Sequence, residues 1–222
     1  MPDITPPGFT ARTFGWFEDL ATHNDKEWVH AHSDTFDELV DRPFREVLAA
    51  LTDRLSDAEV PLKGSEETTF RLNRDVRFTK DKSPYNTHRA ALLTPSGKKD
   101  EDAALLYLHL AADGGFAFCG WHAMEAGELE PMRRRVLERA EAFDEVLAAL
   151  EGEGLALDRD DALKTMPRGF EGEAAHRHAE IVRLKTLGTR LDLPKVAWTS
   201  GDVIDRVEGL ARGTMPLLTF FR

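Results

Sequence analysis

The stretch that decides the fold is AALLYLHLAADGGFAFCGW, residues 103–121. It holds two apolar runs, AALLYLHLA and GFAFCGW, which meet at Asp113, Gly114 and Gly115. An Asp-Gly pair between two apolar runs is typical of the tight turn in a β-hairpin, because glycine accepts the backbone angles that such a turn needs. The stretch therefore predicts two antiparallel strands in the middle of the sequence.

Three further segments have the composition or the period of strands. In TFRLNRDVRF, residues 69–78, apolar and polar residues alternate, which would place them on opposite faces of a strand. Arg74 breaks the apolar series, so we expect it to be paired or to lie at a bulge. HRAALLT, residues 88–94, and IVRLKTLGTRL, residues 181–191, predict two more strands.

Helical periodicity precedes and follows these strands. Near the start, Asn24 with Glu27 three residues later predicts a capping box at a helix N-terminus. The apolar spacing predicts one long helix over residues 127–154 and a last helix over residues 201–213. No repeat or linker divides the sequence. We expect one α+β domain over residues 1–222, with a mainly antiparallel sheet and N-terminal, central and C-terminal helices packed on it.

Composition and charge exclude several classes of protein. A hydrophobic content of 41% is ordinary for a globular protein and too high for disorder. The formal net charge of −11 argues against general affinity for nucleic acid or for an anionic membrane. No run approaches the roughly 20 apolar residues that span a bilayer, and no apolar segment near the start resembles a signal peptide. The single cysteine, Cys119, excludes an internal disulfide, so we expect a cytoplasmic protein.

Common catalytic motifs are missing from the sequence. TPSGKKD, residues 94–100, lacks the first glycine of a phosphate-binding loop and the Ser or Thr after its lysine. No Gly-x-Ser-x-Gly motif is present to place a nucleophilic serine. The histidines lack the neighbouring carboxylates that are typical of a metal site. We expect neither a metal nor a cofactor, and we expect Cys119 to be a buried, inert thiol.

The segment RLNRDVRFTKDKSPYNTHR, residues 71–89, concentrates positive charge in an acidic protein. It contains six Lys or Arg residues and two acids, a local charge of +4. Two cations 6 Å apart repel by roughly 3 kcal/mol at an effective dielectric constant of 20, so the cluster needs compensation. Pro84 predicts a turn within the segment, because proline cannot lie in a central strand.

Two kinds of anion could compensate these cations. In the first interpretation, Arg71, Arg74 and Arg77 form a structural network with the protein's own Asp and Glu residues. In the second, an external phosphate or carboxylate binds there, because a guanidinium grips either group with two parallel hydrogen bonds.

Two other interpretations assign the segment a different role. In a nucleic-acid or protein interaction module, the segment would be a flat basic face with Tyr85 and Phe78 available for stacking. In a hydrolase or transferase, His88 would be the general acid or base, within hydrogen-bond reach of a carboxylate such as Asp75.

RDVRFTKDKSPYNTH, residues 74–88, is similar to the core motif of a domain-of-unknown-function family of bacteria and fungi, the one numbered two-four-six-one. LKTMPRGF, residues 163–170, and RLKTL, residues 183–187, agree with the family in order, so the resemblance spans nearly the whole chain. It implies one domain and no established reaction. Asn86 departs from the family pattern, in which a lysine is expected, and so do Val29 and Thr165.

The resemblance adds two cations from a distant part of the sequence, Arg168 and Lys185. If these fold back onto the basic segment, the positive charges converge on one pocket. We therefore expect a polar pocket that binds a small anionic or phosphorylated molecule. Its expected ligand-binding residues are Arg71, Arg74, Arg77, Lys80, Lys82, Tyr85, His88, Arg168 and Lys185.

Overall fold

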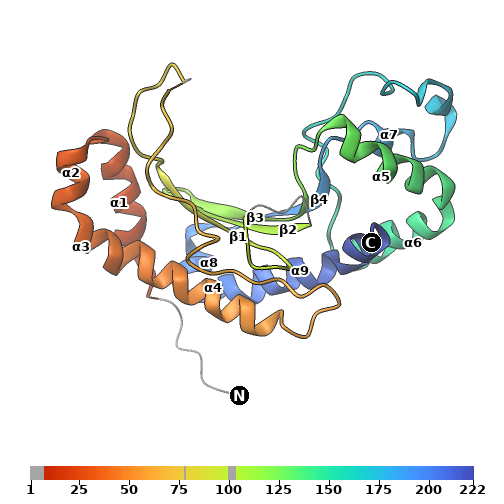
Figure 1. The fold of residues 1–222 in the computed structure, drawn as a ribbon. Coiled ribbons are helices and arrows are strands. Elements are labelled where there is room, and N and C mark those ends of the chain that lie inside the picture. The colour runs from red at the N-terminus through yellow and green to blue at the C-terminus, as the bar shows by residue number, and fades with distance from the viewer. Residues whose placement is uncertain (1–7, 78, 100–103) are drawn as a thin grey trace.

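The computed structural model describes residues 8–77, 79–99 and 104–222. Helices precede, interrupt and follow a four-stranded sheet (Figure 1). The elements before the sheet are α1 (Ala11–Thr22), α2 (Lys26–Ala31), α3 (Ser33–Phe36), a π-helical turn (Asp37–Asp41) and α4 (Arg42–Arg54). The others are β1 (His88–Leu93), β2 (Leu105–Ala111), β3 (Gly114–Trp121), α5 (Ala126–Glu138), α6 (Ala140–Gly152), a 3₁₀ turn (Glu171–Ala175), α7 (Ala179–Val182), β4 (Leu187–Asp192), α8 (Lys195–Thr199) and α9 (Val203–Phe220).

The sheet has the order β1-β2-β3-β4, and every neighbouring pair is antiparallel. The predicted hairpin is confirmed: β2 ends at Ala111, β3 begins at Gly114, and Leu110 lies opposite Gly115. The strand predicted at residues 88–94 is confirmed as β1. The α+β class with a mainly antiparallel sheet is therefore also confirmed.

One face of the sheet is covered and the other is open. Leu106, Leu108 and Leu110 of β2 are fully buried, whereas the residues between them are half-buried. Because successive side chains of a strand point to opposite faces, the leucines define the covered face. In Figure 1, α4, α8 and α9 lie beneath this face.

The buried residues form two clusters. The larger one joins the covered face of the sheet to α1, α4, α8 and most of α9. The smaller one lies among α5, α6, α7 and the end of α9, where Leu217 and Phe220 take part. Trp121 and Leu155 pack against both clusters. In Figure 1, α1, α2 and α3 stand on one side of the sheet and α5, α6 and α7 on the other, so the open face lies between these two groups of helices.

The strand predicted at residues 69–78 is wrong. Only isolated bridges form there, Thr69 with Ala91 and Asn73 with Tyr85. Residues 68–70 pair with the edge of β1, after which the chain leaves the sheet and so lacks the continuous partner that a strand needs. The alternation is still visible, because Arg71, Asn73, Asp75 and Arg77 are exposed whereas Leu72, Arg74 and Val76 are half-buried. Phe78 lies outside the described residues.

Two other predictions of elements need correction. The helix predicted over residues 127–154 is two helices, α5 and α6, because the chain bends at Arg139, where φ is −118° and ψ is 42°. The bend lets α5 pack on α7 while α6 packs along α9. The strand predicted over residues 181–191 begins only at Leu187, because Ile181 and Val182 belong to α7.

The last helix is longer than residues 201–213, since α9 continues through Pro216 to Phe220. No helix in the described part of the chain combines the length and the apolar character needed to cross a membrane.

Candidate functional site

Two rows of directly opposed residues cross the open face of the sheet. The first row runs from Leu92 through Tyr107 and Phe118 to Arg190. The second row runs from Ala90 through His109 and Phe116 to Asp192. Residues directly opposite one another share a face of an antiparallel sheet, so the open face carries a patch of aromatic side chains.

The rings of this patch contact one another. The His109 ring stacks on Phe116 with centroids 4.8 Å apart, and His88 stacks on His109 at 4.4 Å. The Tyr107 hydroxyl and His109 Nδ1 form a hydrogen bond of 3.1 Å. The Arg190 guanidinium lies 3.7 Å from the centroid of Phe116. His88, His109 and Phe116 therefore form a stacked series, and the Arg190 guanidinium lies on its Phe116 end.

The two histidines of the patch are neutral near pH 7. Burial, with a smaller contribution from His88, lowers the pKa of His109 to about 4. Burial also lowers the pKa of His88 below its usual value. Both imidazoles consequently contribute flat neutral rings to the open face, and the positive charge there comes from Arg190.

A cleft of about 480 Å³ lies over the first row. Phe70 forms part of its wall from the edge of β1, and Asp158 forms part from the other edge of the sheet, where its N–H bonds the Gly188 carbonyl. We call this the aromatic cleft. Its lining residues are Phe70, Leu92, Leu105, Tyr107, Phe116, Phe118, His122, Asp158 and Arg190.

Carboxylates compensate several cations of the basic segment. Arg74 forms an ion pair with Asp81, which confirms the expectation that Arg74 is paired. The Arg77 Nη2 atom lies 2.6 Å from Asp75. Arg77 lowers the pKa of Asp75 by donating hydrogen bonds from its side chain and backbone. Two of the expected ligand-binding arginines therefore already hold the segment's own acids.

Arg89, the last cation of the segment, forms an ion pair with Asp41, and the other three contact backbone or solvent. Lys82 donates a 2.9 Å hydrogen bond to the Val76 carbonyl. Lys80 and Arg71 are exposed, and no carboxylate in the described part of the chain lies within ion-pair distance of either. A polar hollow of about 430 Å³ lies beside the segment, lined by Arg74, Tyr85 and His88 among the expected residues.

Asn24 anchors the turn of the basic segment to the N-terminal helices. Its side-chain Nδ2 donates to the Tyr85 carbonyl at 3.0 Å, and its Oδ1 accepts from the Tyr85 N–H at 3.0 Å. Asp25, not Asn24, caps α2, since its carboxylate accepts from the Trp28 N–H. The predicted capping role of Asn24 is therefore wrong.

We expect Asn24→Ala to lower the free energy of unfolding by about 2 kcal/mol, because it leaves both polar groups of Tyr85 without their partner. Hydrogen exchange should show the Tyr85 amide opening faster. Asn86→Ala is the matched control, because the Asn86 amide makes one longer bond of 3.4 Å in the same turn. Equal exchange at Tyr85 in the two variants would contradict the anchoring role.

Arg168 and Lys185 do not line the hollow beside the basic segment. They line a different pocket of about 620 Å³, near the start of α5. The expectation that they close a pocket around the segment is wrong, because the chain from α5 to α7 lies on the opposite side of the sheet from the segment (Figure 1). The nine expected residues thus divide into two groups at separate places.

Two details bear on catalytic interpretations. Among the described residues, no hydrogen bond joins His88 to a carboxylate, because Asp75 binds Arg77 and the His88 ring stacks on His109. Cys119 is buried on the covered face, and burial raises the pKa of its thiol to about 12. No group of metal-binding side chains occurs in the described ranges.

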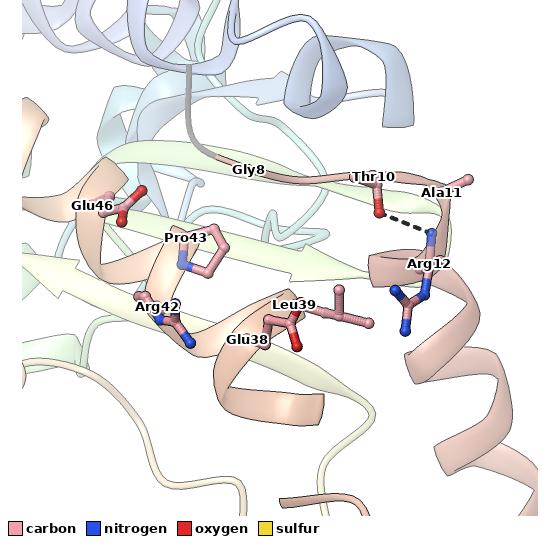
Figure 2. Close-up of a pocket in the computed structure, with 9 residues that line it drawn as sticks. All are labelled: Gly8, Thr10, Ala11, Arg12, Glu38, Leu39, Arg42, Pro43 and Glu46. Carbon is pink, nitrogen blue, oxygen red and sulfur yellow. Dashed lines mark hydrogen bonds between the residues drawn. The ribbon is translucent and has the colours of Figure 1, made fainter. Parts of the chain in front are cut away.

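A hollow of about 470 Å³ between the start of α1 and α4 has balanced charges. Figure 2 shows Arg12, Arg42, Glu38 and Glu46 around it, two side chains of each sign. Arg42 also bonds Asp37 at 3.2 Å. This hollow therefore offers a ligand no unopposed charge.

Sequence reasoning missed the aromatic patch. Tyr107 and His109 alternate with the buried leucines of β2, and Phe116 and Phe118 alternate in β3. This alternation could have predicted the aromatic patch, because every second residue of a strand lies on the same face of the hairpin. The sequence did not show that only one face would be covered by helices.

The family model described as a conserved hypothetical protein (DUF2461) matches residues 12–220. Comparisons with curated proteins and with solved structures gave no match.

Proposed function

This chain belongs to the DUF2461 family, and we propose that it binds a small molecule with a flat ring in the aromatic cleft. The observation that supports this proposal is the row of Tyr107 and Phe118 on the sheet beneath a 480 Å³ cleft, which Phe116 and Phe70 also line. Ligand pockets are typically 300–1,000 Å³ in volume and mainly apolar, with a few polar groups that orient the ligand. The aromatic cleft has this character.

Three polar side chains at the cleft would orient such a ligand. Arg190 would bind an acidic substituent of the ligand, since its guanidinium already lies over Phe116. Its ion pair with Asp192, at 3.1 Å, is exposed and weak, so a ligand carboxylate can replace Asp192 there. Asp158 and His122 would bond donors or acceptors on the ring edge. The anionic ligand expected from the sequence is thus supported beside Arg190 better than within the ion-paired basic segment.

A small molecule fits the charge of the protein better than a nucleic acid does. Stacking platforms for single strands combine aromatic side chains with a basic groove. Here the net charge is −11. Near the cleft, Asp158 and Asp192 offset two cations that lie over its rings, Arg190 over Phe116 and Lys99 over Phe70.

We expect Phe70→Ala to weaken binding of ring-bearing compounds about tenfold, because one aromatic contact contributes about 0.5–1.5 kcal/mol beyond its buried area. Saturation-transfer NMR with adenosine, tryptophan and benzoate should first identify the compounds that bind. Titrations followed by amide chemical shifts should then give affinities for the wild type and the variant.

Val196→Ala is the matched control. Phe70 and Val196 are both exposed large hydrophobic residues, at 39% and 65%, and Val196 does not line the cleft. The control should bind like the wild type. If ring compounds fail to shift the amides of β2 and β3, or if both variants bind equally well, the aromatic cleft is not the binding site.

A further inference from the structure

The pocket near the start of α5 gathers three cations from three separate segments. Arg133 comes from α5, Arg168 from the loop after α6, and Lys185 from the residues that precede β4. Two acids, Glu125 and Asp161, also line the pocket, so the lining side chains carry a net charge of +1. The pocket volume is about 620 Å³.

Arg133 is a buried charge that has no acidic partner among the described residues. The residue is 5% exposed. Its Nη2 donates to the Leu184 carbonyl at 3.1 Å, and its buried Nε has no hydrogen-bond partner. No carboxylate in the described ranges forms an ion pair with it, and burial lowers its pKa. A charge removed from water in this way is costly unless an anion accompanies it.

A comparison with Arg89 shows that Arg133 lacks a carboxylate partner. Arg89 is the comparably buried arginine of β1, and there Asp41 supplies a carboxylate from the protein itself. Arg133 has only a neutral carbonyl. The space beside Arg133 is a pocket, in which an anion from outside can take the place that Asp41 takes beside Arg89.

The other two cations that line this pocket differ in their partners. Lys185 pairs with Asp161 at 2.9 Å, and its N–H bonds the Asp161 carbonyl at 3.0 Å. Arg168 is exposed, and no described carboxylate lies within ion-pair distance of it. The nearby Glu171 instead accepts the Gly169 N–H at 2.9 Å. Arg168 is therefore available to a ligand.

We propose that this pocket binds the phosphate group of a small phosphorylated molecule, held by Arg133, Arg168 and Lys185. Two guanidinium groups and an ammonium suit a doubly charged phosphate monoester, because arginine bonds its oxygens in pairs and lysine adds a point charge. A pocket of 620 Å³ has room for an organic part beside the phosphate. The residues that line this pocket and those that line the aromatic cleft have no member in common.

The test uses the full chain and four probes: inorganic phosphate, ribose 5-phosphate, ribose and acetate. Calorimetric titrations at constant ionic strength should show binding of ribose 5-phosphate and weaker binding of inorganic phosphate. Saturating ribose 5-phosphate should raise the melting temperature by about 3 °C. Ribose and acetate should not bind measurably.

Arg133→Met keeps an unbranched apolar stem and removes the guanidinium charge, so we expect it to weaken ribose 5-phosphate binding at least tenfold. Arg168→Ala removes an exposed side chain without disturbing the core, and its loss should be about fivefold. Arg206→Met, on the exposed side of α9, is the control for the change in net charge. It should bind like the wild type.

Three outcomes would overturn the proposal: no phosphate probe binds, acetate binds as tightly as phosphate, or the Arg206 variant loses as much affinity as the Arg133 variant. If Arg133→Met does not fold, unchanged affinity in Arg168→Ala refutes the site. Phe70→Ala should leave ribose 5-phosphate binding intact, so a failure of this proposal is distinguishable from a failure of ring binding in the aromatic cleft.

Discussion

Replacing Gly115 by alanine is expected to lower the free energy of unfolding by about 4 kcal/mol. Gly115 has a φ of +129°, which side-chain-bearing residues rarely adopt. A Cβ atom added there would lie 2.0 Å from the His109 carbonyl oxygen and 2.8 Å from its carbon. Because the obstacle is the backbone of the paired strand, β2 and β3 would have to separate.

Urea denaturation measures this change, and the melting temperature should fall by about 10 °C for a chain of this length. Gly209→Ala is the matched control. Gly209 lies on the exposed side of α9 with nothing within 4 Å of an added Cβ, so alanine should stabilise the helix by about 0.5–1 kcal/mol. A loss below about 1 kcal/mol in Gly115→Ala would show that the hairpin tolerates the methyl group.

The second large effect is expected for Asp41→Ala. Asp41 and Arg89 form an ion pair in which their side chains are only 16% and 11% exposed. Burial lowers the pKa of Arg89, and Asp41 opposes this shift. Removing the carboxylate leaves the Arg89 guanidinium with the Phe70 carbonyl and the face of the Phe36 ring. Breaking a buried pair in this way costs about 3 kcal/mol. Urea denaturation should show that loss.

A double variant separates two contributions to the free energy of unfolding: the penalty for leaving Arg89 buried without a carboxylate, and the stabilisation by the ion pair itself. Asp41→Leu combined with Arg89→Leu removes both charges, and replacing a buried ion pair by apolar residues is often nearly neutral. We therefore expect the double variant to be more stable than Asp41→Ala. If it is less stable, the pair itself holds the helices of the N-terminal half to β1.

The hairpin could be predicted because its signals are local. Asp113 and Gly114 favour a tight turn whatever surrounds them, and the apolar runs on either side are strands of ordinary length. The segment at residues 69–78 has the same alternation without such a partner. Its bonds beyond Phe70 go to Pro84 and Asn86 of its own returning chain, so period two alone did not make a strand.

The candidate sites depend on contacts that the sequence does not show. The family resemblance pointed to Arg168 and Lys185, and they were grouped with the basic segment as further cations. Their position, however, follows from how α5 and α7 pack. Arg133 had a usable signal. It follows Leu129 by four residues and precedes Val136 by three, which places an arginine on the apolar stripe of a helix. Such a position is a candidate for a buried charge.

Helix α9 belongs to both buried clusters, and this limits how the two halves of the protein can move. Met215 packs in the larger cluster and Leu217 in the smaller one, and Pro216 lies between them. A proline inside a helix removes one backbone hydrogen bond and weakens resistance to bending at that point. A hinge motion that widens or narrows the space above the open face would bend α9. The bend would require the least free energy at Pro216.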